Sequence, residues 1–264
     1  SRYVEKFSSK IIGTNNYEDT SDSDVVVITA GLPRKPGMSR MDLLEVNANI
    51  VTDVTKNIMN HSKNPIIIVV TNPLDQMTTL VADVSGLPKG RVIGQAGVLD
   101  SSRFAYFISE NLNVNMKDIN AWTLGSHGET MVPAPSQCTV NGKPLSEFLS
   151  YEEINELVKR TSDGGAEIVG LLKTGSAYFA PSSAAATMVK SIISDSNEIL
   201  PACSWVEGQY GINDVYLGVP TKLGRDGVTE IVEFKLDSEE LKNLKSAAES
   251  VKNKVSELKD LKTQ

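Results

Sequence analysis

The chain has 264 residues, of which 40% are hydrophobic and 22% are charged, which is the balance of a globular protein with a substantial core. Its net charge of −7, without any basic tract, argues against a nucleic-acid partner. No hydrophobic run approaches the roughly 20 residues that a membrane span needs, so we expect no membrane association.

The two cysteines and two histidines restrict the chemistry further. Cys138 and Cys203 lie far apart and match no metal-binding spacing, so we expect reduced thiols and a cytoplasmic protein. A histidine-rich metal site is excluded because only His61 and His127 are present, and we expect no bound metal.

The first third of the chain alternates short β-branched runs with helical patterns. The sequence predicts helices at 41–60 and 74–84, and strands at 9–15 (SKIIGTN), 25–30, 66–70 and 91–94. Strands that alternate with helices in this way indicate a parallel sheet with right-handed crossovers.

From residue 97 the pattern changes. We predict helices at 101–112, 151–172 and 183–194, strands at 119–124 and 231–236, and a hairpin at the Asn141-Gly142 turn. The C-terminal helix has apolar residues that step by three and four, which fits packing on its own core or a short coiled coil: Leu241, Leu244, Ala248, Val251, Val255 and Leu258.

Polar residues follow the predicted strands of the parallel sheet. Arg34 and Arg40 follow the first strand, Asn72 the second, and Asp100 and Arg103 the third. Loops at the carboxyl ends of parallel strands form the ligand crevice of an open sheet. Each of these residues alone is also compatible with a solvated loop or a turn.

His127 lies between small residues in the segment LGSHGET, just after an apolar run. It is either a loop residue with one hydrogen bond or a group that transfers a proton near neutral pH. If Asp100 binds one ring nitrogen, the other nitrogen is free to face a substrate. No nucleophile motif such as GxSxG accompanies it, so a covalent mechanism has no candidate.

Several segments, in order along essentially the whole chain, resemble the malate dehydrogenases of the lactate-dehydrogenase-like family. They are GLPRKPGMSR, VTNPLD, GVLDSSRF, HGETMVP, and LLKTGSAYFAP with EGQYGINDVYLGVP. The resemblance implies an oxidoreductase with NAD as cofactor, which oxidises (S)-malate reversibly to oxaloacetate in the tricarboxylic acid cycle and forms a homodimer or homotetramer.

The resemblance also implies roles for individual residues. His127 would exchange the proton with the substrate, with Asp100 as its partner. Arg103 would bind the C1 carboxylate, Arg40 the reacting carbonyl and Arg34 the distal carboxylate. Asn72 would contact both substrate and nicotinamide. The residues expected to line the cofactor are Gly31, Asn47, Val70, Thr71 and Asn72.

Two alternatives to malate oxidation stay open. One is an L-lactate or broader 2-hydroxyacid dehydrogenase, against which Arg34 argues, because an arginine facing the methyl group of pyruvate would be buried without a partner. The other, from a different class, is a truncated subunit without catalytic activity.

The family also has a glycine-rich GxGxxG turn and an acidic residue that binds the adenine ribose, and neither is found here. We therefore expect an α/β chain that is N-terminally truncated. Residues 1–97 would be the remainder of a Rossmann-type parallel sheet domain that lacks its first βαβ unit, and residues 98–264 an α+β substrate domain. NADP stays open as an alternative cofactor.

Overall fold

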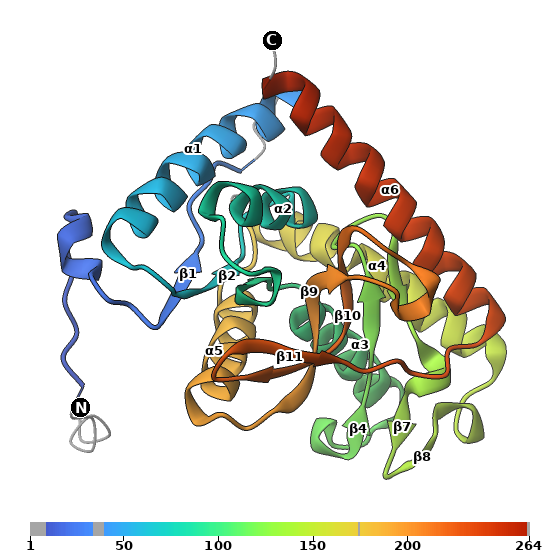
Figure 1. Cartoon of the computed structure of the whole chain (residues 1–264). Coiled ribbons are helices and arrows are strands. Elements are labelled where there is room, and N and C mark those ends of the chain that lie inside the picture. Colours follow the sequence, from blue (N-terminus) through green and yellow to red (C-terminus); the bar gives the residue numbers. More distant parts are fainter. Residues whose placement is uncertain (1–8, 34–39, 174, 263–264) are drawn as a thin grey trace.

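The computed structural model describes residues 9–33, 40–173 and 175–262. Within these ranges the chain forms a mixed α/β fold around an eight-stranded sheet of order β1-β2-β3-β9-β10-β5-β6, with β11 paired to β10 (Figure 1). The helices are α1 (Arg40–His61), α2 (Leu74–Ser85), α3 (Gly97–Leu112), α4 (Tyr151–Leu172), α5 (Phe179–Ser194) and α6 (Ser238–Lys262). The strands of the main sheet are β1 (Val25–Ile28), β2 (Ile66–Val69), β3 (Val92–Gly94), β5 (Thr123–Gly125), β6 (Met131–Pro133), β9 (Glu198–Val206), β10 (Val215–Gly224) and β11 (Gly227–Ile231). The predicted α/β class is confirmed.

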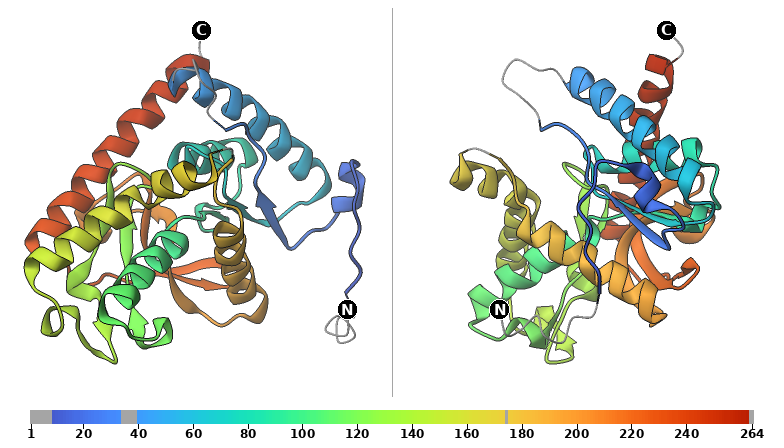
Figure 2. Two further views of the ribbon diagram at one scale, coloured as in Figure 1. Left: turned by 180° about the vertical axis from the view of Figure 1, so that it is seen from behind. Right: turned by 90° about the vertical axis from the view of Figure 1, so that its left-hand side faces the viewer.

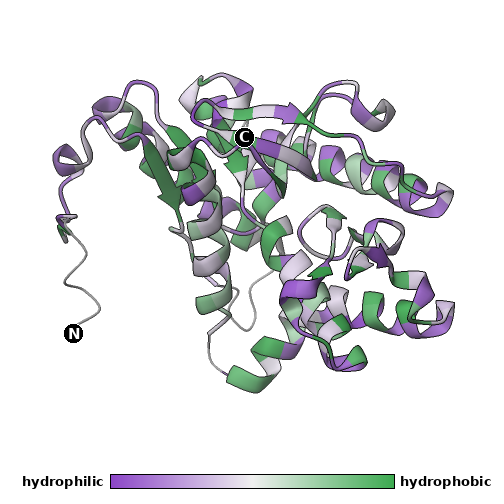
Figure 3. Cartoon of the chain, turned by 90° about the horizontal axis from the view of Figure 1, so that it is seen from below, coloured by the Kyte–Doolittle hydropathy of each residue, from purple (hydrophilic) through white to green (hydrophobic). Residues whose placement is uncertain are grey.

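The strands β1, β2 and β3 are parallel, as predicted. Strand β2 is buried along its whole length because successive residues point to opposite, covered faces. Ile67 and Val69 pack with α1 and α2, whereas Ile66 and Ile68 pack with Met188 and Ile192 of α5. Among the described residues β1 pairs with β2 alone, and its hydrophobic sequence stands out in Figure 3.

The two longest strands, β9 and β10, were not predicted. They pair antiparallel from Val206 opposite Val215 to Glu198 opposite Leu223. Pro201 and Pro220 face each other in this ladder, and proline inside a hydrophobic run normally argues against a central strand. Strand β9 also pairs with β3 at Cys203 and Gly94, so the parallel and antiparallel parts form one continuous sheet.

Three predicted strands differ from those in the structure. Residues 9–15 form no strand, and Ile11 is 84% exposed. The predicted strand at 119–124 is two strands: β4 (Ile119–Asn120) pairs with β7 (Thr139–Val140), while β5 joins the main sheet. Of the predicted strand at 231–236, only Ile231 lies in a strand, because β11 ends at that residue.

Other elements follow the sequence closely. The Asn141-Gly142 turn joins β7 to β8 (Lys143–Pro144) as an antiparallel hairpin, as predicted. Helix α3 begins four residues earlier than expected, at Gly97, and α5 begins at Phe179. Within the described part of the chain, no helix is long and apolar enough to cross a membrane.

Helix α6 packs on the core of its own chain, which confirms the first interpretation of its apolar pattern. Leu244, Ala248 and Val251 are buried against the antiparallel strands, and Leu258 reaches the cluster around α1 and α2. Figures 1 and 2 show α6 running along one side of the molecule, with the C-terminal end of α6 beside α1.

Gly218 allows β10 to approach β5, the strand that leads to His127. The two strands pair at Gly218 and Gly125, and a Cβ atom on Gly218 would lie 2.4 Å from the Gly125 carbonyl oxygen. We expect Gly218→Ala to lower the free energy of unfolding by about 2 kcal/mol or more, measured by urea denaturation, because the two backbones must separate.

Gly170→Ala is the matched control for this prediction. Gly170 lies in α4 and a Cβ atom there would meet nothing within 4 Å, so the change should be neutral or stabilising by up to about 1 kcal/mol. An equal loss of stability in both variants would contradict the role assigned to Gly218.

Candidate active site

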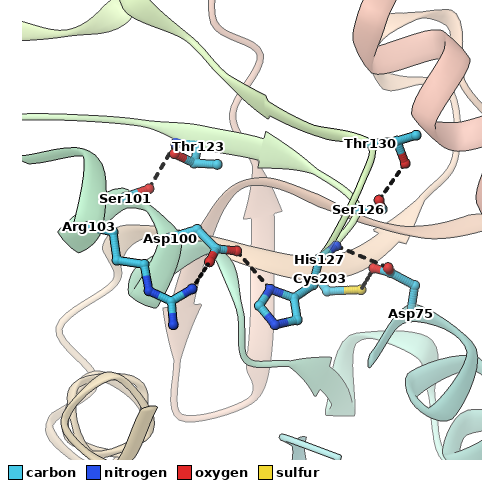
Figure 4. Close-up of polar contacts among 9 residues, drawn as sticks. All are labelled: Asp75, Asp100, Ser101, Arg103, Thr123, Ser126, His127, Thr130 and Cys203. Atoms are coloured by element: carbon cyan, nitrogen blue, oxygen red, sulfur yellow. Dashed lines mark hydrogen bonds and ion pairs between the residues drawn. The ribbon is translucent and has the colours of Figure 1, made fainter. Parts of the chain in front are cut away.

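The sheet brings His127 and Asp100 together from distant parts of the sequence. Asp100 lies in the first turn of α3, just after β3, and His127 follows β5. His127 Nδ1 lies 2.8 Å from Asp100 Oδ2 (Figure 4). Because an ionised carboxylate can only accept hydrogen bonds, this contact places a proton on Nδ1. The neutral imidazole then presents Nε2 as its free acceptor.

Arg103 binds the second oxygen of the same carboxylate. Its Nη1 donates to Asp100 Oδ1 at 3.2 Å, so Asp100 lies between the guanidinium and the imidazole. Gly164 and Gly165 of α4 leave room beside the arginine, since a Cβ on Gly164 would already lie 3.4 Å from Arg103 Cδ. Arg103 Nε is buried and has no hydrogen-bond partner within the described residues. The arginine therefore has donor capacity left for a ligand.

The surroundings of His127 favour its protonated form. Burial by itself would lower the pKa of His127. The charge of Asp100, its hydrogen bond and the charge of Asp75 outweigh burial and the repulsion by Arg103, so the pKa is raised above its usual value of 6.5. An imidazole of this kind can both release and accept a proton near neutral pH.

The five residues expected to line a cofactor gather where β1 and β2 end. Asn47 Nδ2 donates to the Asn72 carbonyl at 2.8 Å, and its Oδ1 accepts from the Leu32 amide at 2.7 Å. Thr71 Oγ1 donates to the Ala30 carbonyl, and a Cβ on Gly31 would lie 2.8 Å from Thr71 Cγ2. Asn47 and Thr71 thus hold the two loops together.

The remaining members of this group are more accessible. Asn72 is exposed, and Val70 is partly exposed. Arg34 lies outside the described residues, and Arg40 is the first residue of α1, with its side chain outside the description. The roles expected for these two arginines stay predictions.

The sequence analysis missed two residues at the site. Asp75 is only 3% exposed; its Oδ2 accepts from the His127 amide at 3.1 Å and its Oδ1 from the Cys203 thiol at 3.4 Å. The signal for Asp75 was its place in VTNPLD, directly after a buried strand and in the first turn of a helix. A small cavity of about 10 Å³ lies between Asp75, Asp100, His127 and Cys203.

Comparison with known proteins identifies the family. The family model described as the lactate/malate dehydrogenase NAD binding domain matches residues 3–94, and the model of the alpha/beta C-terminal domain of the same proteins matches residues 97–262. The chain belongs to the lactate/malate dehydrogenase family. The two matched regions meet at the start of α3, close to the change of pattern seen in the sequence.

Individual relatives agree over most of the chain. A malate dehydrogenase of Chlorobium luteolum is 52% identical over 248 residues, which are 94% of this chain and 80% of that protein. The malate dehydrogenase structure from Salinibacter ruber is 45% identical with a TM-score of 0.90, and the match covers 95% of this chain and 80% of that one. The lactate dehydrogenase of Cryptosporidium parvum, solved with lactic acid and nicotinamide adenine dinucleotide, is 42% identical with a TM-score of 0.91, covering 96% and 81%.

Proposed function

We propose that this protein is an NAD-dependent malate dehydrogenase, which oxidises (S)-malate reversibly to oxaloacetate. The observation that carries the proposal is the bridge formed by Asp100 between Arg103 and His127, at 3.2 and 2.8 Å. It brings a guanidinium, which can bind a carboxylate, close to an imidazole, which can transfer a proton. Binding a 2-hydroxy acid requires this combination, since its carboxylate and its hydroxyl are on adjacent carbons.

NAD fits the residues at the ends of β1 and β2. Gly31 has no side chain to intrude on a ligand, and Asn72 is exposed at the carboxyl end of a parallel strand, where open sheets bind nucleotides. The cofactor would be held by Gly31, Asn47, Val70, Thr71 and Asn72. When bound, NAD supplies the acceptor for the hydride that leaves C2 of malate. The match to the NAD-binding domain of the family supports this choice.

The protein's own contribution is to hold the substrate and to move the proton. Arg103 would bind the C1 carboxylate through paired N–H groups. This places the C2 hydroxyl toward His127, whose Nε2 takes the hydroxyl proton as the hydride leaves. Asp100 fixes the ring through Nδ1 and stabilises the imidazolium that forms. In the reverse direction the same nitrogen returns the proton to the carbonyl oxygen.

Two arginines whose side chains are not in the described part of the structure would complete the site. Arg40 would stabilise the charge on the reacting carbonyl, and Arg34 would bind the distal carboxylate that malate has and lactate lacks. The lactate dehydrogenase relative keeps the alternative of an L-lactate enzyme relevant. A truncated subunit without activity is the least consistent with a formed Asp100–His127–Arg103 bridge.

Several wider properties belong to the same proposal. We infer a cytoplasmic enzyme of the tricarboxylic acid cycle that forms a homo-oligomer. We also infer that the cofactor-binding and substrate-binding regions divide near residue 97, with the division spanned by the sheet pairing of β3 and β9.

Substrate choice tests the proposal directly. The purified protein, supplied with NADH, should reduce oxaloacetate with a kcat/KM at least about a hundredfold above that for pyruvate. Pyruvate lacks the distal carboxylate that Arg34 would bind, and a desolvated charge without a partner costs several kcal/mol. Preference for pyruvate would indicate the lactate alternative. Absence of turnover with either acid would contradict the proposed activity.

The raised pKa of His127 predicts opposite pH dependences for the two directions. Oxidation of malate needs the neutral imidazole, so its kcat/KM should rise with pH through the pKa of His127, which lies above 6.5. Reduction of oxaloacetate needs the protonated ring, so its kcat/KM should fall through the same pKa. Steady-state kinetics from pH 5 to 10 would measure both limbs. The same pH dependence in both directions, or a rate of malate oxidation that falls as the pH rises through the pKa of His127, would contradict the assignment.

A further inference from the structure

Asp75 is a buried acid that the chemistry above does not use. It lies in the first turn of α2, two residues after the Asn72-Pro73 pair. Both of its carboxylate oxygens are occupied: Oδ2 by the His127 amide and Oδ1 by the Cys203 thiol. A buried carboxylate is costly unless it is hydrogen-bonded and balanced by a positive charge. The surroundings of Asp75 supply both.

His127 lies between two carboxylates. Figure 4 shows Asp100 on one side of the histidine and Asp75 on the other, carried by α3 and α2. The ionisable groups that face His127 are Asp100 and Arg103 from α3, Asp75 from α2 and Cys203 from β9. Both acids are in first helical turns, where the helix dipole favours negative charge.

The contact between Asp75 and His127 also joins two loops of the site. Helix α2 begins directly after the loop that carries Asn72, and the accepting oxygen of Asp75 binds the main chain of the histidine loop. That loop is closed on itself by a hydrogen bond of 2.6 Å between Ser126 and Thr130. The distance between Asn72 and His127 is therefore set by a short, buried connection through Asp75.

The Cys203 thiol keeps the carboxylate in place. Cys203 lies in the middle of β9 opposite Gly94 and Gly218, where the sheet is continuous. Burial raises the pKa of Cys203 well above its usual value, with Asp75 adding to the effect, so the thiol keeps its proton and acts as a donor. Burial also raises the pKa of Asp75, and His127 and the thiol oppose this effect.

From this geometry we propose that Asp75 is a positioning residue for the proton transfer. Its carboxylate fixes the main chain of His127 through one oxygen, is fixed by Cys203 through the other, and favours the protonated imidazole through its charge. The role in proton transfer rests on the proposed dehydrogenase function, whereas the effect of Asp75 on the histidine does not.

Asp75→Asn separates charge from geometry, because the amide oxygen can still accept from the His127 amide. We expect the pKa of His127 to fall, measured by NMR titration of the imidazole protons. The chain has only one other histidine, His61, so the imidazole signals are few and can be assigned. On the alkaline side of the profile, the rate of oxaloacetate reduction should fall about five- to tenfold because less imidazolium is present.

Asp83→Asn is the matched control. Asp83 also lies in α2 but is on the surface, where its Oδ1 is 3.6 Å from Lys89 Nζ. It should shift neither the His127 titration nor the pH profile. Asp75→Ala removes the acceptor as well, and we expect kcat to fall about tenfold beyond Asp75→Asn with KM for NAD little changed. An unchanged His127 titration in Asp75→Asn would overturn the proposal.

A measurement on the unmodified protein keeps the proposal testable if the variants do not fold. The His127 amide proton should exchange slowly with solvent and should resonate downfield, as expected for a hydrogen bond to a carboxylate. Rapid exchange of this amide would overturn the proposal. These readouts need no substrate, so a failure to oxidise malate would contradict the proposed function and leave the test of Asp75 intact.

Discussion

His127→Asn is expected to lower kcat about 10³-fold in both directions, because a positioned acid–base group contributes roughly 10²–10⁴ in rate. The asparagine cannot exchange a proton, while Arg103 and its ion pair with Asp100 stay in place. KM for NAD should change little, because the residues expected to hold the cofactor follow β1 and β2, whereas His127 follows β5. Stopped-flow measurement of NADH formation would give the rate of the chemical step.

His61→Asn is the matched control for this result. His61 is the only other histidine in the sequence and lies in the last turn of α1, before β2 begins, whereas the site residues follow the ends of the strands. Its substitution should leave kcat within about twofold, because we assign no substrate or cofactor contact to this partly exposed residue. Equal losses in the two variants, or a loss below about tenfold in His127→Asn, would contradict the acid–base role.

Arg34→Gln is expected to reduce kcat/KM for oxaloacetate by about 10²–10⁴-fold, while that for pyruvate stays level or rises. The glutamine cannot balance the charge of the distal carboxylate, so a dicarboxylate substrate would lose its partner. Pyruvate has a methyl group at that position and loses nothing. The ratio of the two kcat/KM values, measured with NADH at one pH, is the decisive quantity.

Lys35→Gln supplies the control for Arg34, because it removes a positive charge from the adjacent position of the same segment. We expect it to change both kcat/KM values by less than about threefold, because no substrate group is assigned to Lys35. If Arg34→Gln lowered turnover of oxaloacetate and pyruvate equally, the residue would have no role in specificity.

The parallel part of the fold could be predicted because its signals are local. The runs that became β1 and β2 are short and rich in valine and isoleucine, and the helix between them, α1, has an apolar stripe. The pair β9 and β10 could not be predicted, because their prolines face each other in the ladder and only the tertiary pairing makes this acceptable. The strand predicted at 9–15 is absent because Ile11 and Ile12, although they favour strands, stay exposed and pair with no neighbouring strand among the described residues.

The proximity of the candidate site residues could be predicted where a residue followed a strand and resembled a family motif. His127, Asp100 and Arg103 are brought together by sheet pairing, and their geometry is the one expected for proton transfer beside a carboxylate. Asp75 gave a weaker signal, since an acid at the start of a helix is usually explained by the helix dipole. Cys203 gave none, because only the pairing of β9 with β3 places it beside Asp75.

The continuous sheet has a consequence for how the enzyme prepares for catalysis. Asp75 binds Cys203 next to the pair Cys203–Gly94, where the parallel strands join the antiparallel ones. A rotation of the parallel part of the sheet against the antiparallel part would break this pairing, so we expect the groups around the histidine to keep their positions before a substrate binds. Little reorganisation energy is then needed when positive charge develops on the imidazole ring. In water, by contrast, solvent dipoles would have to reorient around that charge. The backbone of the sheet thus preorganises His127 for its proposed role as acid and base.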